Sequence, residues 1–230
     1  MGYLKDYRAY SGIVYVVLGS RPFPEAIDLT EVGRSVPGCK ITSYHVDSDF
    51  AGVRLGMKVC AQRDFNGDGL DDLVVSASRW DCCEATDDRG CGGIFVVFGR
   101  TEWPAFLDLD VAADRARDVC WVKSCMPGSC LGEEMLDAID DITGDALPDL
   151  LVSASAVATY LISGARLAPG EFNVIELATA HFDGTSLMQL LGLEIGDWDG
   201  DGIGDLAMRS PAQRTTLADL SSEGCVSLVP

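Results

Sequence analysis

The chain contains 230 residues with 36 acidic and 17 basic side chains, which gives a formal net charge of −19 at pH 7. This charge argues against nucleic acid and anionic membrane surfaces as partners, because both repel a strongly acidic protein. Apolar residues make up 47% of the sequence, enough for a globular core, and no stretch reaches the roughly 20 apolar residues that span a bilayer. We therefore expect an ordered globular protein without a membrane span.

Short apolar segments recur along the chain in a fixed order. The segment 12–20, GIVYVVLGS, returns as GGIFVVFGR at 92–100, ATYLISGAR at 158–166 and EGCVSLVP at 223–230. These segments are rich in β-branched and aromatic residues and bounded by Gly or Pro, which predicts strands. A weaker echo follows in AIDLTEV, FLDLDVA and VIELATA. No segment sustains the apolar period of a long helix, so the sequence predicts an all-β repeat protein.

A second repeated segment places a tight acidic loop between two predicted strands. Its three copies begin with Leu-Gly at Leu55, Leu131 and Leu191. Counted from the first aspartate of each loop, side chains that carry oxygen occupy positions 1, 3, 5 and 9. They are Asp64, Asn66, Asp68 and Asp72 in the first loop, Asp141, Thr143, Asp145 and Asp149 in the second, and Asp197, Asp199, Asp201 and Asp205 in the third.

A tightly curled turn directs alternate side chains inward, where they converge with the backbone carbonyl at position 7. Position 7 is Leu70, Leu147 and Ile203 in the three loops. Calcium takes six to eight oxygen ligands, whereas zinc prefers His or Cys, and no loop contains His. The sequence therefore predicts up to three calcium ions. We expect the second loop to bind most weakly, because Thr143 is a neutral ligand and Ala146 replaces a glycine.

Two alternatives explain such loops differently. An EF-hand loop opens in the same way, but it needs a glutamate at position 12 and flanking helices, and position 12 is Val75, Val152 and Met208. Ordinary Asp-Gly turns without metal are the second alternative, since D-G and N-G dipeptides mark many hairpins. Three loops in register, each with an acid at position 9, favour calcium.

The order of predicted strands suits a four-stranded antiparallel unit, which is the blade of a β-propeller. We predict the outer strands of one blade in residues 1–50, full blades in 51–127 and 128–188, and an incomplete blade in 189–230. This is too little chain to close a ring in the usual way. We expect an incomplete propeller or a fragment, completed by the remaining blades of a longer chain or by self-association through open blade edges.

The repeated segments resemble FG-GAP repeats, the blades of the integrin α-subunit β-propeller and of many secreted bacterial proteins. The resemblance covers nearly the whole chain, and the acidic loop is its best-retained part. The Phe-Gly of that family becomes Leu-Gly in all three copies, and its Gly-Ala-Pro becomes Ser-Ala-Ser in two. The resemblance implies that calcium holds the hairpin of each blade and has no catalytic role.

Nine cysteines are many for a reducing cytosol, and several lie within about ten residues of one another. We predict disulfides that close short loops; the candidates are Cys82, Cys83, Cys91, Cys120, Cys125 and Cys130. Zinc binding is the alternative, but the spacings lack paired C-x2-C knuckles. Disulfides indicate an extracellular or cell-surface chain, although the opening residues MGYLKDYRAY carry no export signal.

The sequence shows no catalytic motif, and His45 and His181 lie in no recognisable site. We predict a non-catalytic calcium-binding module for extracellular interaction or adhesion, which binds an unknown protein or glycan through the variable loop 79–92. Two alternatives stay open. In the first, the chain is an accessory propeller of a secreted hydrolase or lyase. In the second, it is a sugar-binding propeller in which Trp80, Trp103 or Trp121 stacks on a sugar ring.

Overall fold

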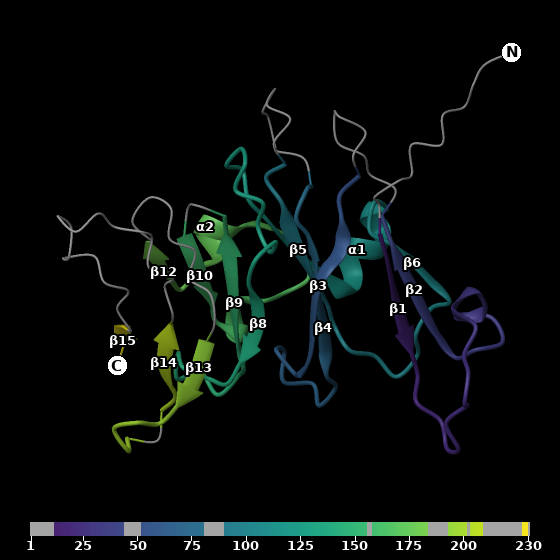
Figure 1. The fold of residues 1–230 in the computed structure, drawn as a ribbon, viewed down its shortest axis with the longest axis horizontal. Coiled ribbons are helices and arrows are strands. Elements are labelled where there is room, and N and C mark those ends of the chain that lie inside the picture. The colour runs from purple at the N-terminus through teal and green to yellow at the C-terminus, as the bar shows by residue number, and fades with distance from the viewer. Residues whose placement is uncertain are drawn as a thin grey trace, which may run out of the picture.

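The computed structural model describes residues 12–43, 52–80, 90–155, 158–183, 193–201, 203–208 and 227–229. Over these residues the fold is nearly all β, and its strands form four sheets that stand side by side in a row (Figure 1). The sheets are mainly antiparallel and do not close into a ring within the described part of the chain. The predicted all-β fold of blade-like sheets in an incomplete propeller is confirmed.

We number the sheets in chain order. The second sheet contains a complete four-stranded antiparallel meander. Its strands pair in chain order, so each is hydrogen-bonded to its predecessor. They are β3 (Leu55–Arg63), β4 (Asp72–Ala77), β5 (Gly93–Val97) and β7 (Val119–Lys123). Every residue of β5 is buried, which explains why that strand reads as a continuous apolar run.

The third sheet repeats the same meander. Its strands are β8 (Leu136–Ile139), β9 (Asp149–Ala154), β10 (Ala158–Ile162) and β12 (Ala180–Asp183). They pair antiparallel in the order β12-β10-β9-β8. Both β9 and β10 are buried along their whole length, so this sheet also lies inside the row.

The two end sheets contain fewer strands. The first sheet pairs β1 (Ile13–Val17) with β2 (Gly38–Thr42), and the fourth joins β13 (Leu193–Gly196), β14 (Asp205–Met208) and β15 (Ser227–Val229). The sequence predicted the outer strands of one blade at the first of these sheets and an incomplete blade at the other. The exact division of the chain into blades stays a prediction.

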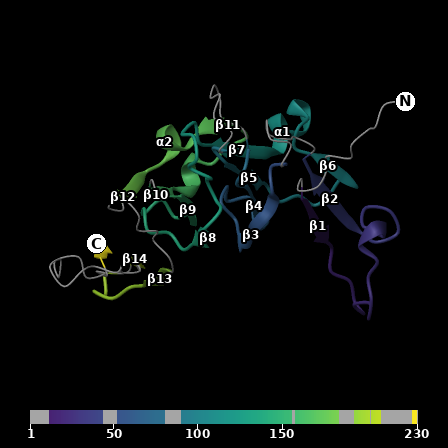
Figure 2. The ribbon, with the colours of Figure 1, turned by 45° about the horizontal axis from the view of Figure 1, so that its top comes forward.

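Two short strands pair in parallel with the outer strand of the preceding sheet. β6 (Phe106–Asp108) precedes β7 in the chain but pairs with β2, and β11 (Gly170–Asn173) precedes β12 but pairs with β7. We call β6 and β11 the clasp strands. Figure 2 shows each clasp strand beside the outer strand that it covers. Each clasp strand therefore links its own sheet to the sheet before it.

Apolar side chains fill the spaces between successive sheets. The largest cluster joins the second and third sheets and includes Phe65, Ile94 and Leu131. A second cluster joins the first and second sheets, and a small third one reaches Leu206 on β14 of the fourth sheet. Each sheet thus buries its faces against its immediate neighbours.

The Leu-Gly pairs form joints between sheets. Gly92 at the start of β5 has φ +78°, and a Cβ there would lie 2.2 Å from the backbone nitrogen of Leu131. A Cβ on Gly12 would likewise lie 2.0 Å from the carbonyl oxygen of Leu55. Glycine is required because the backbone of the next sheet occupies the place of a side chain. Leu55 and Leu131 are themselves buried, so the joint also contributes to the core.

Short helices were not expected from the apolar periodicity. α1 (Ala112–Asp118) and α2 (Val174–Leu177) lie in the connections that follow the clasp strands. The 3-10 turns η1 (Leu29–Glu31) and η2 (Gly164–Arg166) complete the helical content of the described residues. No helix in this part of the chain has the length and apolarity that a membrane crossing needs.

Candidate metal centres

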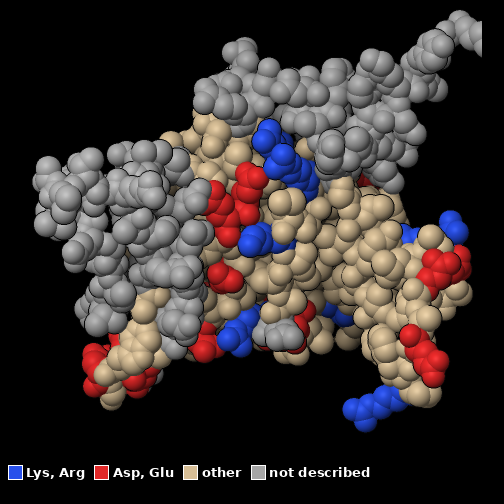
Figure 3. Space-filling view, in the orientation of Figure 1, with Lys and Arg blue, Asp and Glu red and all other residues tan. Residues whose placement is uncertain are grey.

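All three acidic loops turn at the same end of the molecule. The hairpins β3–β4, β8–β9 and β13–β14 each reverse at the lower edge of Figure 1. In Figure 3, acidic side chains cover the tip of the β13–β14 hairpin at the lower left. The fold therefore places the three predicted metal loops on one edge, one for each consecutive sheet.

The aspartate at position 1 organises each loop through its own carboxylate. The backbone N–H groups of Gly67 and Asp68 donate to Oδ1 of Asp64 at 2.7 and 3.1 Å, and that of Gly69 donates to Oδ2 at 2.7 Å. Asp141 and Asp197 accept hydrogen bonds from the same positions of their own loops. Such Asp-to-backbone bonds stabilise a tight turn, so the curl predicted from the spacing exists in all three loops.

Positions 5 and 9 are oriented by further backbone donors. At position 5, Asp68, Asp145 and Asp201 each accept a hydrogen bond from the N–H of position 7 at 2.7 to 2.8 Å. At position 9, the aspartate accepts from the N–H of position 2, and the donors are Phe65, Ile142 and Trp198. The carbonyl at position 7 is the backbone oxygen that the spacing predicts as a metal ligand.

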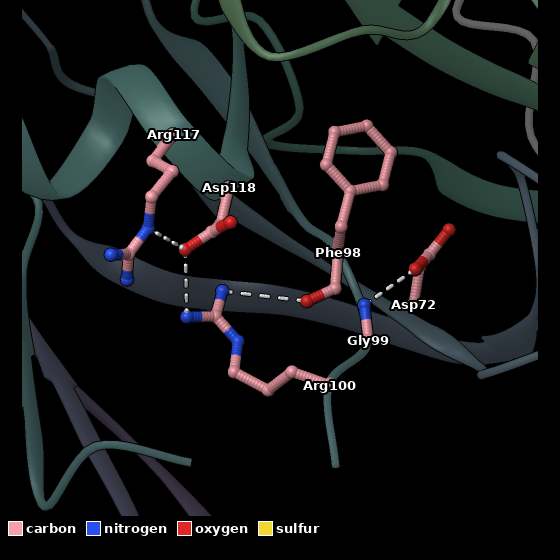
Figure 4. Close-up of polar contacts among 6 residues, drawn as sticks. All are labelled: Asp72, Phe98, Gly99, Arg100, Arg117 and Asp118. Atoms are coloured by element: carbon pink, nitrogen blue, oxygen red, sulfur yellow. Dashed lines mark hydrogen bonds and ion pairs between the residues drawn. The ribbon is translucent and has the colours of Figure 1, made fainter. Parts of the chain in front are cut away.

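In the first and second loops, the position 9 aspartate also bonds to a glycine just after the third strand of its sheet. Asp72 Oδ1 accepts a 2.7 Å hydrogen bond from the N–H of Gly99, and Asp149 Oδ1 accepts a 3.3 Å bond from that of Gly164. Figure 4 shows Asp72 with Gly99, beside the ion pair between Arg100 and Asp118. Sequence reasoning identified the aspartates but not these glycine partners, which lie 27 and 15 residues further along the chain.

Burial raises the proton affinity of the position 9 carboxylates. Asp72 is 1% exposed, and its burial, with the charges of Asp64 and Asp68, raises its pKa to about 6 against the opposing hydrogen bonds. Burial also raises the pKa of Asp149 above its ordinary value. An ionised carboxylate is costly in such a place unless a positive charge lies beside it. Asp72 and Asp149 therefore offer buried negative charge to a cation.

Carboxylate oxygens converge in two of the loops. One ligand oxygen from each of Asp141, Asp145 and Asp149 lies within 4.8 Å of the others, and Asp197, Asp199 and Asp205 form an equivalent group. Among the described residues, the carboxylates of the first loop form no such group of three. An all-oxygen donor set on a flexible loop fits calcium better than zinc or copper.

The second loop differs from the others in its backbone and its neighbours. Ala146 adopts φ +69°, a left-handed conformation that residues other than glycine rarely adopt. The hydroxyl of Ser163 donates to Oδ2 of Asp145, and the N–H of Ala165 donates to the same oxygen at 3.3 Å. Burial raises the pKa of Asp145, but these hydrogen bonds outweigh it and the net shift is downward. Sequence reasoning missed Ser163 as a partner of this loop.

Comparison with known families bears on the second sheet. Residues 56–90 match the family model described as FG-GAP repeat, a segment that spans β3, the first acidic loop and β4. This segment is similar to an FG-GAP repeat. A search of curated proteins gave no match. The suspected resemblance is thus supported by the match, and FG-GAP repeats are units of β-propellers, in agreement with the blade-like sheets.

Two predicted disulfide cysteines are free thiols in the structure. Cys120 lies inside the core on β7, packed against apolar side chains, and burial raises its pKa to about 12. Cys130 is also free, which corrects the prediction for both residues. Cys91 and Cys125 are assigned to disulfides, while Cys82 and Cys83 lie outside the described residues. The disulfide pairing stays a prediction.

The tryptophans predicted to stack on sugars lie largely in the core. Trp80 and Trp121 are 6% and 7% exposed, and their rings pack 5.2 Å apart beside Phe95. Burial therefore removes both from a sugar-stacking role. Trp103 is partly buried against the same cluster. His181 is exposed on β12, and His45 lies outside the described residues, as does most of the predicted binding loop 79–92.

Proposed function

We propose that this chain is a non-catalytic calcium-binding propeller module, in which one calcium ion rigidifies the hairpin of each blade. The observation that carries the proposal is the convergence of three carboxylates in the second and third loops within 4.8 Å. Three like charges at this separation repel each other, and a divalent cation among them removes that repulsion. The ligands would be positions 1, 3, 5 and 9 with the carbonyl at position 7.

The same geometry supports a structural role for the ion. Each loop connects the first two strands of its sheet, and Asp72 and Asp149 extend the connection to the end of the third strand. A bound ion would therefore fix three strands at one edge of the blade. The three loops contain no histidine or cysteine, which fits binding better than catalysis.

The module would act at the cell surface or outside the cell. FG-GAP repeats, a high cysteine content and assigned disulfides at Cys91 and Cys125 support this location. Millimolar calcium outside cells suits loops of this kind. The partner would be an extracellular protein, which binds variable loops held in place by the rigid blades.

Thermal unfolding with millimolar calcium and with chelator tests the proposal. A loop saturated at about 100 times its dissociation constant adds about 2.7 kcal/mol to the free energy of unfolding, or about 5–10 °C in a chain of this size. Asp201→Asn should reduce this gain, because it removes one ligand charge and keeps the acceptor for the N–H of Ile203. Asp71→Asn, an exposed acid at position 8, is the matched control. Equal midpoints with calcium and chelator would contradict calcium binding.

Calcium binding to the first loop should weaken in mild acid. Asp72 must be ionised to bind the ion, and its pKa is raised to about 6 in the metal-free chain. Protons therefore compete below pH 6, and the apparent affinity should fall by about tenfold for each pH unit. Calorimetric titration of the Asp145→Asn, Asp201→Asn double variant at pH 7.5 and 5.5 isolates this loop. An unchanged affinity between the two would exclude Asp72 as a ligand.

A further inference from the structure

One short sequence pattern occurs three times and makes the same local hydrogen bond each time. The copies are PEAIDL at 24–29, PAFLDL at 104–109 and PGEFNV at 169–174. In each, the fifth residue accepts a hydrogen bond from the N–H two residues later. The distances are 2.8 Å for Asp28 with Thr30, 3.0 Å for Asp108 with Asp110 and 2.9 Å for Asn173 with Ile175. The three segments therefore share this turn at their fifth residue.

The second and third copies are the clasp strands, and they dock in the same register. Leu107 of β6 lies opposite Ile41 of β2, and Phe172 of β11 lies opposite Val122 of β7. Backbone bonds fix both ends of the first of these pairings. Lys40 N–H donates to the Ala105 carbonyl at 3.2 Å, and Leu109 N–H donates to the Thr42 carbonyl at 2.8 Å. The pattern thus marks a strand that adds to the outer strand of another sheet.

In the first copy, the equivalent apolar side chains are exposed to solvent. Leu109 and Val174, which follow the Asp or Asn of the docked copies, are 0% and 1% exposed. Their counterpart Leu29 is 47% exposed, and Phe23 in front of the pattern is 62% exposed. This segment lies beside η1 at the outer end of the row in Figure 1, where no described strand pairs with it. It shares the Asp turn of the clasp strands, and among the described residues it covers no outer strand.

The third sheet has the complementary feature. Its outer strand β12 holds the position that β2 and β7 hold in their sheets, and among the described residues no strand pairs with its far edge. Phe182 lies opposite the second residue of β10. Ile41 and Val122 likewise lie opposite the second residues of β1 and β5. Phe182 is thus the residue that an incoming clasp strand would meet.

We propose that segment 24–29 is a docking strand for β12 of a second copy of this chain, paired in parallel with Ile27 opposite Phe182. The contact is head-to-tail, because one copy supplies the strand and the other supplies the edge. It needs no metal and stands apart from the calcium proposal.

Two features make this association weak in the parent chain. The register places Asp28 opposite Asp183, where the docked third copy has Asn173 opposite Lys123. Like charges at paired positions of neighbouring strands are unfavourable. In addition, β1 precedes segment 24–29 as β5 precedes β6. Docking therefore places β1 of the incoming copy beside β14, where β15 pairs in the parent chain. Association therefore competes with the β14–β15 pairing.

Sedimentation velocity of the full chain across a wide concentration range tests the proposal. We expect association that rises with concentration and is at least tenfold weaker in the Phe23→Ser, Leu29→Ser double variant. Met57→Ser, which changes an apolar side chain 51% exposed on β3, should leave it unchanged. Because all three side chains are exposed, the variants are expected to fold, and their thermal midpoints check this. Equal association of the double variant and the parent would overturn the proposal.

A gain of association gives an independent test of the register. Asp28→Asn reproduces the residue of the docked third copy, keeps the acceptor for the N–H of Thr30 and removes the charge opposite Asp183. We expect it to tighten association about two- to fivefold. If the parent and Asp28→Asn both sediment as monomers at every concentration, a second copy does not occupy this strand and the proposal is wrong.

Discussion

Replacing Phe65 with alanine is expected to lower the free energy of unfolding by about 3–5 kcal/mol. Phe65 sits at position 2 of the first acidic loop, yet it is fully buried in the cluster between the second and third sheets. Its carbonyl oxygen also lies against Gly164 at the end of β10. The substitution therefore opens a cavity at the junction of two sheets. Chemical denaturation of the metal-free chain measures the effect without a contribution from the ion.

The third loop supplies a matched control for this prediction. Trp198 occupies the same loop position as Phe65, and its backbone N–H donates to the position 9 aspartate in the same way. Its side chain, however, is 50% exposed. Trp198→Ala should therefore change the free energy of unfolding by less than about 1 kcal/mol. Similar losses in the two variants would mean that loop position, and not burial between sheets, sets the cost.

Gly92→Ala is expected to destabilise the chain by more than about 4 kcal/mol or to prevent folding. The added methyl group would lie 2.2 Å from the backbone nitrogen and 2.9 Å from the carbonyl oxygen of Leu131. Backbone atoms cannot rotate away as a side chain can, so the second and third sheets must separate at this joint. The yield of folded protein and the thermal midpoint report the effect.

Gly144→Ala separates steric overlap from backbone strain. Gly144 has φ +78°, the same value as Gly92, but a Cβ there meets no atom within 4 Å. The left-handed conformation alone costs about 1–2 kcal/mol for an alanine. The neighbouring Ala146 already adopts φ +69° in the same loop. A loss at Gly144 as large as that at Gly92 would show that conformation, and not the joint with Leu131, requires glycine.

The acidic loops could be predicted from sequence because their information is local. Each loop curls through bonds between residues at most seven positions apart, and alternation of aspartate with glycine records that curl. The strands of the meanders were predictable for the same reason, since β-branched runs bounded by Gly mark them. Both features depend on neighbours in the chain.

Other parts of the structure depend on distant residues and left no readable pattern. The clasp strands were visible only as a weak echo, because parallel pairing with another sheet has no local signature. Cys120 resembled a disulfide cysteine by spacing, but its partner in space is the apolar core. Gly99 and Gly164 became part of the metal loops only when the third strand folded back beside them. These contacts require the assembled sheets.

The clasp strands also set an order of events during synthesis. β2 emerges early, but the strand that covers its outer edge, β6, lies in the segment between β5 and β7 of the next sheet. In the same way, β7 waits for β11 from the third sheet. A chain made from its N-terminus therefore carries an open edge on β2 and then on β7, until β6 and β11 cover them. Ribosome pausing after β5 would leave β2 available for wrong pairing, whereas pausing after β6 would not.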